Sequence, residues 1–223
     1  MKTAVIGLGN FGARLAKNLV VGGESIIVAA RDLAKAKAFA KTLGGEPDAM
    51  SIADAVKQAD VVILGIWFET IKEFVIAHRA SLAGKIIVDP SNPIAPDGKG
   101  GFTKIIPAHQ SSGQIIARLL PEGAELVKAF GTVSADSLET AARRKPEPAV
   151  LFYATDYPEA GRAIAKLITA SGFAPVNVGG VDQSVRIEAF GELSEYGKLG
   201  RLVTSKEAEV LINQAPRLQL KSA

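Results

Sequence analysis

A glycine-rich turn near the N-terminus is the segment whose residue types and spacing point most directly to chemistry. Residues 7–12 are Gly-Leu-Gly-Asn-Phe-Gly, placed between an apolar run (residues 2–6) and a helical pattern (residues 11–21). There Gly7 permits a tight turn, Gly9 lets a phosphate approach the backbone, and Gly12 lets the helix pack closely on the strand. The helix N-terminus adds free N–H groups and partial positive charge. A purely structural turn is the alternative, but the pattern favours a dinucleotide site on Gly7, Leu8, Gly9, Asn10, Phe11 and Gly12.

The end of the second predicted strand bears on which dinucleotide is bound. NAD sites usually place a carboxylate there to accept the ribose hydroxyls, whereas this sequence has Ala30 and Arg31. Arg31 is suited to pair with a 2′-phosphate, and Lys35 adds a cation one helical turn later. Asp32 is either a ribose acceptor, which would favour NAD, or the N-cap of the next helix. We expect NADP(H), bound in part by Ala30, Arg31 and Lys35.

Three further segments follow predicted strands and would border the nicotinamide half of the site, because ligands cross the carboxyl ends of parallel strands. Trp67 offers either a stacking wall or ordinary core packing, and two prolines stiffen the loop that contains Asn92. An Asn and Ser loop can hold a carboxamide or a ribose by hydrogen bonds. The expected contacts are Ile66, Trp67, Phe68, Asn92, Pro93, Gly131 and Thr132.

No residue is assigned with certainty as a catalytic acid or base. Hydride transfer between two stacked heterocycles depends mainly on alignment and needs no protein nucleophile. His109, which precedes a predicted helix, is the candidate for steadying charge on a reduced ring, and otherwise a loop histidine. We expect His78 on a helix surface, and Lys104 is the other residue available for acid–base chemistry.

Composition excludes several other classes of protein. The chain has 223 residues, 26 basic and 23 acidic side chains, two histidines and no cysteine. A formal charge of +3 gives no support to dedicated nucleic-acid binding. A disulfide scaffold and a His/Cys zinc site are excluded, and no metal is expected. No apolar run approaches the roughly 18–20 residues of a membrane-spanning helix, so we expect a cytoplasmic protein without a membrane partner.

Strands alternating with helices predict an α/β, Rossmann-type doubly wound, mainly parallel sheet with right-handed crossovers and a small C-terminal helical portion. We expect an NADP-binding Rossmann domain over residues 1–180 and a helical extension over residues 181–223. Residues 90–101 are expected to form a loop, and residues 184–199 one helix. Arg186 and Glu188 on that helix are expected either to line the far side of the substrate pocket or to pair at a subunit interface.

The chain resembles the NADP-dependent reductases of the deazaflavin coenzyme F420, a family also similar to the oxidoreductase domain of STEAP metalloreductases. The resemblance rests on GLGNFG (7–12), AARD (29–32), DPSNP (89–93), KGGFT (99–103) and VKAFGTVSA (127–135). It implies NADPH on the glycine-rich turn and hydride transfer between the nicotinamide and a deazaflavin or another flavin-like co-substrate.

The sequence departs from the family near Trp67, where a proline is common, and at Gly131, where histidine or asparagine is common. The glycine predicts a wider nicotinamide half-site. A dehydrogenase or imine reductase of a small metabolite and a non-catalytic NADPH-binding redox sensor remain as alternatives. A small-molecule redox acceptor and a second copy of the chain, in a homodimer, are the expected partners.

Overall fold

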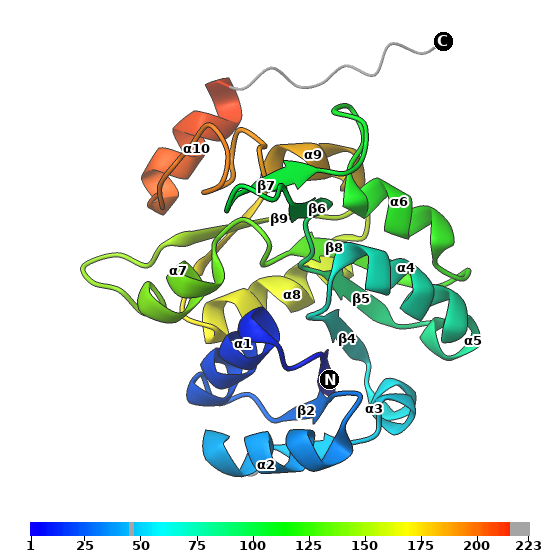
Figure 1. The fold of residues 1–223 in the computed structure, drawn as a ribbon. Helices are drawn as coiled ribbons and strands as arrows, with labels where there is room; N and C mark the ends of the chain where they lie inside the picture. The colour runs from blue at the N-terminus through cyan, green and yellow to red at the C-terminus, as the bar shows by residue number, and fades with distance from the viewer. Residues whose placement is uncertain (45–46, 215–223) are drawn as a thin grey trace.

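The computed structural model describes residues 1–44 and 47–214 and shows a twisted eight-stranded sheet between two layers of helices (Figure 1). The strand order is β10-β9-β8-β5-β4-β1-β2-β3. Every pair in the sheet is parallel except β8 with β9. The strands are β1 (Thr3–Ile6), β2 (Ile26–Ala29), β3 (Asp48–Met50), β4 (Val61–Leu64), β5 (Ile86–Asp89), β8 (Glu125–Ala129), β9 (Val150–Ala154) and β10 (Ala174–Asn177).

Helices follow most of these strands, as the alternating pattern predicts. The helices are α1 (Asn10–Val21), α2 (Leu33–Leu43), α3 (Ile52–Gln58), α4 (Phe68–Ala77), α5 (Arg79–Leu82), α6 (Ser112–Leu119), α7 (Ala135–Thr140), α8 (Pro158–Ala170), α9 (Ser184–Ile187) and α10 (Ser205–Gln214), with a 3₁₀ turn, η1 (Val181–Gln183). This doubly wound arrangement confirms the Rossmann-type α/β fold.

The central strands are apolar on both faces because helices cover both. In β1, Val5 packs with α1, α7 and α8, whereas Ala4 and Ile6 pack with α3, α4 and α6. In β4, Ile63 and Leu64 divide between the two faces in the same way. Alternation of side chains along a strand therefore builds two cores from each short apolar run.

The strand order places the switch point of the sheet between β1 and β4. From β1 the chain proceeds outward to β2 and β3, and it then returns to β4 on the other side of β1. The carboxyl ends of parallel strands beside such a point are where open α/β sheets bind ligands. The turns after β1, β2, β4, β5 and β8 all lie at this edge.

The β9 strand runs against the expected parallel direction. The chain leaves β8 and reaches β9 through α7, which has six residues. The connection begins and ends at the carboxyl edge of the sheet, so β9 enters antiparallel to β8.

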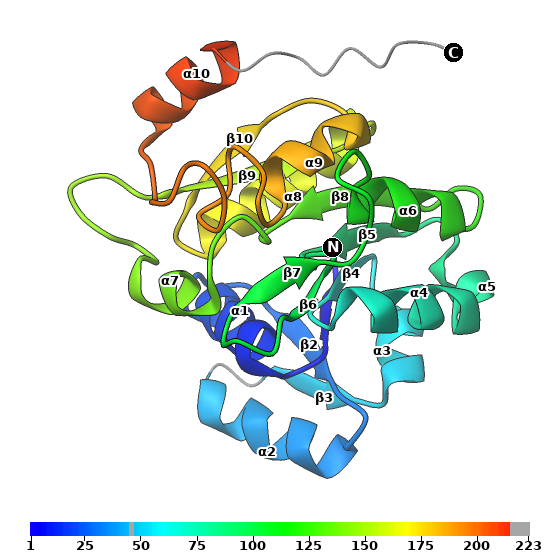
Figure 2. The ribbon, with the colours of Figure 1, turned by 45° about the horizontal axis from the view of Figure 1, so that its top comes forward.

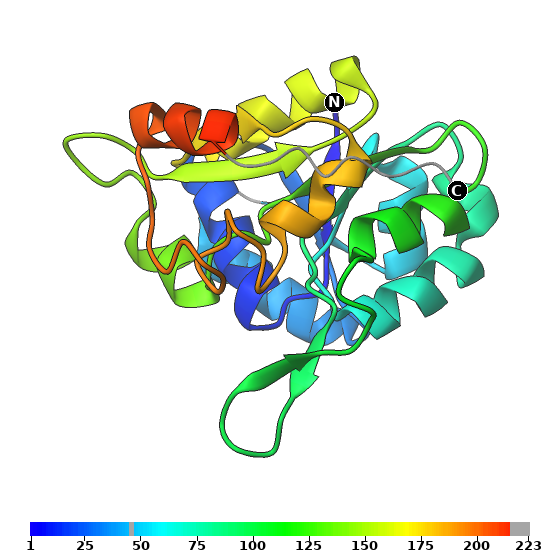
Figure 3. The same cartoon turned by 90° about the horizontal axis from the view of Figure 1, so that it is seen from above.

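Two segments contain strands that the sequence analysis did not predict. Residues 48–50, to which no element was assigned, form the edge strand β3, paired with β2. The expected loop over residues 90–101 instead begins an antiparallel hairpin of β6 (Ile94–Pro96) and β7 (Phe102–Lys104). Figure 2 labels the two strands of this hairpin, and Figure 3 shows it, in green, extending beyond the body of the sheet.

The expected single helix over residues 184–199 was wrong. Only α9 is helical, and the chain then turns repeatedly before α10. A Cβ on Gly191 would lie 2.5 Å from the Arg186 carbonyl oxygen, and one on Gly197 would lie 1.7 Å from the Gly191 oxygen. Close backbone contacts at these two glycines replace the helix with a folded loop, whose Leu193 joins an apolar cluster around Phe152 of β9.

Candidate functional site

The turn after β1 is built by backbone contacts that only glycine allows. Gly7 has φ +93°, and a Cβ there would lie 2.6 Å from the Gly65 carbonyl oxygen. A Cβ on Gly12 would lie 2.0 Å from the Gly7 oxygen. The Gly7 N–H donates to the Ala29 oxygen at 2.8 Å. The turns after β1, β2 and β4 are therefore packed directly against one another.

Gly9 leaves the start of α1 open. It is the N-cap, it provides no side-chain cap, and the first turn of α1 has no acidic residue. A Cβ at Gly9 would meet no atom within 4 Å. By contrast, Ser51, Ser111 and Ser134 cap α3, α6 and α7 with their side chains. The α1 terminus thus offers amide donors, positive dipole charge and unobstructed space, which together fit a phosphate group.

The end of β2 presents two cations and a carboxylate that is already engaged. Asp32 Oδ1 accepts from the Ala34 N–H at 2.9 Å and from the Lys35 N–H at 3.2 Å, so Asp32 is the N-cap of α2. This confirms the capping interpretation of Asp32. Ala30 is half-buried beside it. Arg31 and Lys35 are exposed and form no ion pair within the described part of the chain.

The three residues after β4 that were expected to contact the ligand differ in how far they are buried. Trp67 is 60% exposed and begins α4 as its N-cap, so it is not a core residue. Ile66 is half-buried, and its Cγ2 would lie 2.4 Å from a Cβ on Gly7. Phe68 is buried in the core with Ile71. Only the backbone of Phe68 remains available at the site, and the ring predicted to contact a ligand points into the core.

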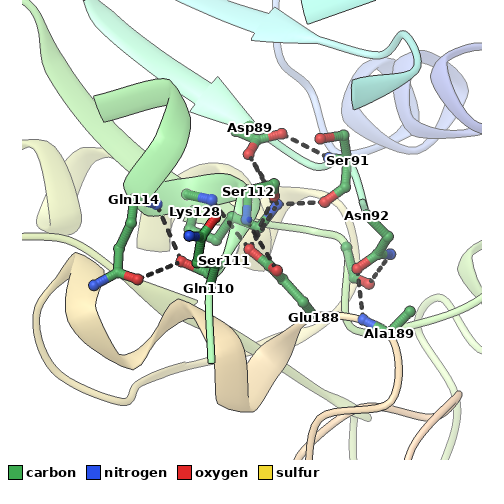
Figure 4. Close-up of polar contacts among 12 residues, drawn as sticks. Asp89, Ser91, Asn92, Gln110, Ser111, Ser112, Gln114, Lys128, Glu188 and Ala189 are labelled. Carbon is green, nitrogen blue, oxygen red and sulfur yellow. Dashed lines mark hydrogen bonds and ion pairs between the residues drawn. The ribbon is translucent and has the colours of Figure 1, made fainter. Parts of the chain in front are cut away.

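The Asn92 side chain connects three loops through hydrogen bonds. Its Oδ1 accepts from the Ala189 N–H at 2.7 Å, and its Nδ2 donates to the Gly131 oxygen at 3.0 Å (Figure 4). The Asn92 side chain, expected to hold a carboxamide or a ribose, is thus engaged by the protein backbone. Pro93 is buried behind it. The observed function of the Asn92 side chain is to fix the loop after β5.

Gly131 does not widen the site, contrary to the expectation from the sequence. A Cβ there would lie 2.5 Å from the Pro90 carbonyl oxygen, so the space of the missing side chain is filled by backbone. Thr132 is buried, its oxygen accepts from the Glu195 N–H at 2.9 Å, and its Oγ1 has no partner among the described residues.

Sequence reasoning missed a buried charged network behind this edge (Figure 4). Lys128 Nζ lies 2.8 Å from Asp89 Oδ2 and 3.7 Å from Glu188 Oε1, and it donates to Ser112 Oγ at 2.7 Å and to the Ser91 oxygen. None of these three ionisable residues is more than 1% exposed. A lysine inside the apolar run of β8 was the available signal, because lysine is almost never fully buried without a partner.

Glu188 joins the C-terminal segment to the N-terminus of α6. Its carboxylate accepts from the Ser112 and Gly113 N–H groups, each at 3.1 Å, and from the Ser112 hydroxyl at 2.9 Å. Burial raises the pKa of Glu188, opposed by the Lys128 ammonium and the two amides and reinforced by the Asp89 carboxylate. Glu188 therefore belongs to an internal anchor, and neither to a pocket wall nor to a subunit interface.

Arg186 also differs from its expected role. It is buried, and its Nε donates to Glu192 Oε1 at 2.6 Å within the same segment. The pairing is therefore local.

The acid–base candidates are not gathered at one point. His109 is exposed in the loop before α6, and His78 is half-buried with its ring centroid 4.5 Å from that of Phe74. Lys104 Nζ donates to the carbonyls of Ala108 and Gln110 at 3.1 and 2.8 Å. Burial lowers the pKa of Lys104, opposed by the Glu188 charge. Lys104 thus holds the loop that carries His109.

No helix in residues 1–44 and 47–214 is long and apolar enough to cross a bilayer. The same residues contain no group of three or more His, Cys, Asp or Glu side chains placed to hold a metal ion.

Comparison with known proteins gives one family and several relatives. Residues 2–93 match the family model described as NADP oxidoreductase, coenzyme F420-dependent. The chain is 30% identical over 199 residues to the F420-dependent NADP reductase of Methanothermobacter thermautotrophicus, covering 84% of this chain and 85% of that protein. It is 27% identical to the metalloreductase STEAP3 of Rattus norvegicus, covering 84% of this chain but 36% of that protein. The chain thus spans about a third of STEAP3.

A solved structure resembles nearly the whole chain. A hypothetical protein from Sinorhizobium meliloti superposes with a TM-score of 0.80 at 29% identity, covering 92% of this chain and 96% of that chain. The likeness therefore includes the C-terminal segment as well as the strands around the switch point.

Proposed function

The chain belongs to the coenzyme F420-dependent NADP oxidoreductase family, and we propose that it transfers a hydride between NADP(H) and a deazaflavin of the F420 type or another flavin-like acceptor. Membership makes it an NADP-dependent oxidoreductase. The choice of acceptor is the proposed step, supported by the name of the Methanothermobacter reductase, which the chain matches over most of both lengths.

The observation that carries the NADP assignment is the open start of α1 next to Arg31. Gly9 leaves the amide donors of the helix uncovered, and Asp32 caps α2 through its Oδ1. The one carboxylate of residues 29–32 is thus partly engaged by the cap, while two exposed cations, Arg31 and Lys35, lie beside it. This combination suits a diphosphate together with a 2′-phosphate and disfavours plain NAD.

Residues of this chain would hold NADP(H) at both ends. The turn of residues 7–12 would bind the diphosphate, Arg31 and Lys35 the 2′-phosphate, and Trp67 and the backbone near Thr132 the nicotinamide half. The bound nicotinamide supplies or receives the hydride. The protein contributes alignment, and the loops that do so are stiffened by Asn92 and by the Lys128 network behind them.

Reduction of a small carbonyl or imine compound has weaker support. Such a reaction requires a proton donor at the site, whereas Lys104 donates to two backbone carbonyls and His109 lies exposed on a loop. Hydride transfer between two ring systems requires no proton donor from the protein, because the proton that the reduced ring takes up on nitrogen can come from solvent, which agrees with these placements.

A direct assay tests the proposal. Protein and NADPH are mixed with coenzyme F420, FMN, FAD, a ferric chelate, a ketone or an imine in turn, and NADPH oxidation is followed by absorbance. We expect fastest turnover with F420, and loss of turnover in a folded Gly9→Val control. Tight NADPH binding without turnover of any acceptor would instead establish a redox sensor. Turnover restricted to ketones or imines would establish a small-metabolite reductase.

A further inference from the structure

Phe190 holds a backbone conformation that is costly for its type. Its φ is +70°, in the left-handed region, where a bulky side chain collides with its own backbone. Its side chain is 49% exposed, so burial of the ring in the core does not compensate for this strain. Glycine adopts such a conformation without strain, and Gly191 follows immediately. An exposed aromatic ring is therefore kept at a position where glycine would be easier to accommodate.

The surrounding contacts hold this conformation in place. Two residues earlier, Glu188 is locked to the α6 N-terminus by hydrogen bonds from Ser112 and Gly113. The Ala189 N–H donates to Asn92 Oδ1 at 2.7 Å, and the Phe190 N–H donates to the Tyr196 oxygen at 3.2 Å. Strained residues persist where their neighbours over-determine them, and they concentrate at functional sites.

These anchors also place Phe190 at the carboxyl edge of the sheet. Asn92 follows β5, and it joins Ala189 to Gly131, which follows β8 (Figure 4). The next strand toward the switch point is β4, whose end carries the exposed Trp67. The C-terminal segment thus brings an exposed aromatic side chain to the same edge as the proposed nicotinamide contacts.

We infer that Phe190 is a specificity-determining residue that offers an aromatic face to the planar, conjugated ring of the redox acceptor. The inference rests on the proposed function and adds to it the class of acceptor selected, a fused heteroaromatic ring. Aromatic faces stabilise such rings by offset stacking, and a rigidly held ring loses little entropy on binding. The contact belongs to the acceptor and is separate from the nucleotide contacts at Gly9 and Arg31.

Three variants test this role. Phe190→Gly removes the ring and relieves the backbone strain, Phe190→Tyr keeps an aromatic face, and Tyr157→Leu is the matched control. Tyr157 is a comparably exposed aromatic residue (40%) beyond the end of β9, which runs antiparallel and so ends at the opposite edge of the sheet. The measurements are KM for NADPH and for F420, equilibrium binding of F420 by its fluorescence, and Tm.

We expect Phe190→Gly to weaken F420 binding and raise its KM by about tenfold, with KM for NADPH within about twofold of the wild type. Its Tm should equal or exceed that of the wild type, which excludes misfolding as the cause. Phe190→Tyr and Tyr157→Leu should retain wild-type F420 binding. Unchanged F420 binding in Phe190→Gly would overturn the inference while leaving the proposed function intact. A wild-type protein that neither binds nor turns over F420 or FMN would instead refute the proposed function.

Discussion

Lys128 and Asp89 form an ion pair in the interior of the protein, with Nζ 2.8 Å from Oδ2 and both side chains fully buried. Asp89 is the last residue of β5, and Lys128 lies on the adjacent β8. Glu188 brings a second carboxylate to the same ammonium. A lysine placed here therefore fixes the loops of three separate chain segments directly behind the proposed site.

Replacing Lys128 tests the cost of breaking this network. Lys128→Met leaves two buried carboxylates without their cation, so we expect a loss of about 3–5 kcal/mol in the free energy of unfolding. Arg162→Met removes a comparable but exposed pair with Glu159 and should change the free energy by no more than about 0.5 kcal/mol. Urea unfolding of the three proteins measures both. Equal small losses would show that the buried pair contributes no more than a surface one.

The buried Glu188 should give stability a characteristic pH dependence. Because its pKa is raised in the folded state, the native protein binds its proton more tightly than the unfolded chain does. Its favourable contribution is thus complete below the unfolded pKa of about 4.3 and is lost as pH rises through the folded pKa. The unfolding free energy of the wild type should therefore fall, relative to that of Glu188→Gln, as pH increases over this range.

Denaturant midpoints measured at several pH values test this prediction. Lys128 and Asp89 face Glu188 in both proteins, so the difference between the two curves isolates residue 188. Parallel curves would contradict the prediction.

Arg31→Ala should affect the KM for NADPH and the KM for NADH to different extents. If the guanidinium pairs with a 2′-phosphate, KM for NADPH should rise by about tenfold or more, with little change for NADH. Lys41→Ala, an exposed cation in the last turn of the same helix as Lys35, is the control and should affect neither. Steady-state kinetics with both nucleotides give the answer, and equal effects on NADPH and NADH would argue against a 2′-phosphate contact.

Two glycines of the same turn should respond in opposite ways to an added side chain. Gly9 has an ordinary φ of −74° and open space around its Cβ position, so Gly9→Val should keep Tm within about 2 °C of the wild type. Its dissociation constant for NADPH should still rise by about tenfold or more, because the side chain occupies the phosphate position.

Gly12→Ala provides the contrast. A Cβ at Gly12 lies 2.0 Å from a backbone oxygen, so this variant should lower Tm markedly. Calorimetry and thermal melts separate the two effects. Normal NADPH binding by Gly9→Val would exclude the diphosphate from this turn.

Features that depend on neighbouring residues could be predicted from the sequence. The glycine-rich turn, the cap at Asp32 and the alternation of strands and helices are local patterns, and the structure contains each of them. Short-range sterics, capping hydrogen bonds and side-chain periodicity do not require knowledge of the rest of the fold. The Rossmann-type class was therefore predictable.

Contacts between residues that are distant in the sequence could be recognised only in the tertiary structure. Lys128 meets Glu188 sixty residues later in the chain, and Asn92 meets Ala189 over 97 positions, so no local pattern encodes either contact. The antiparallel direction of β9 is seen only in its pairing with β8, and the path after α9 only in the close backbone packing at Gly191. Charges become buried, and strained loops persist, only when several segments converge. For this reason the buried Lys128 network behind the site could be recognised only in the folded chain.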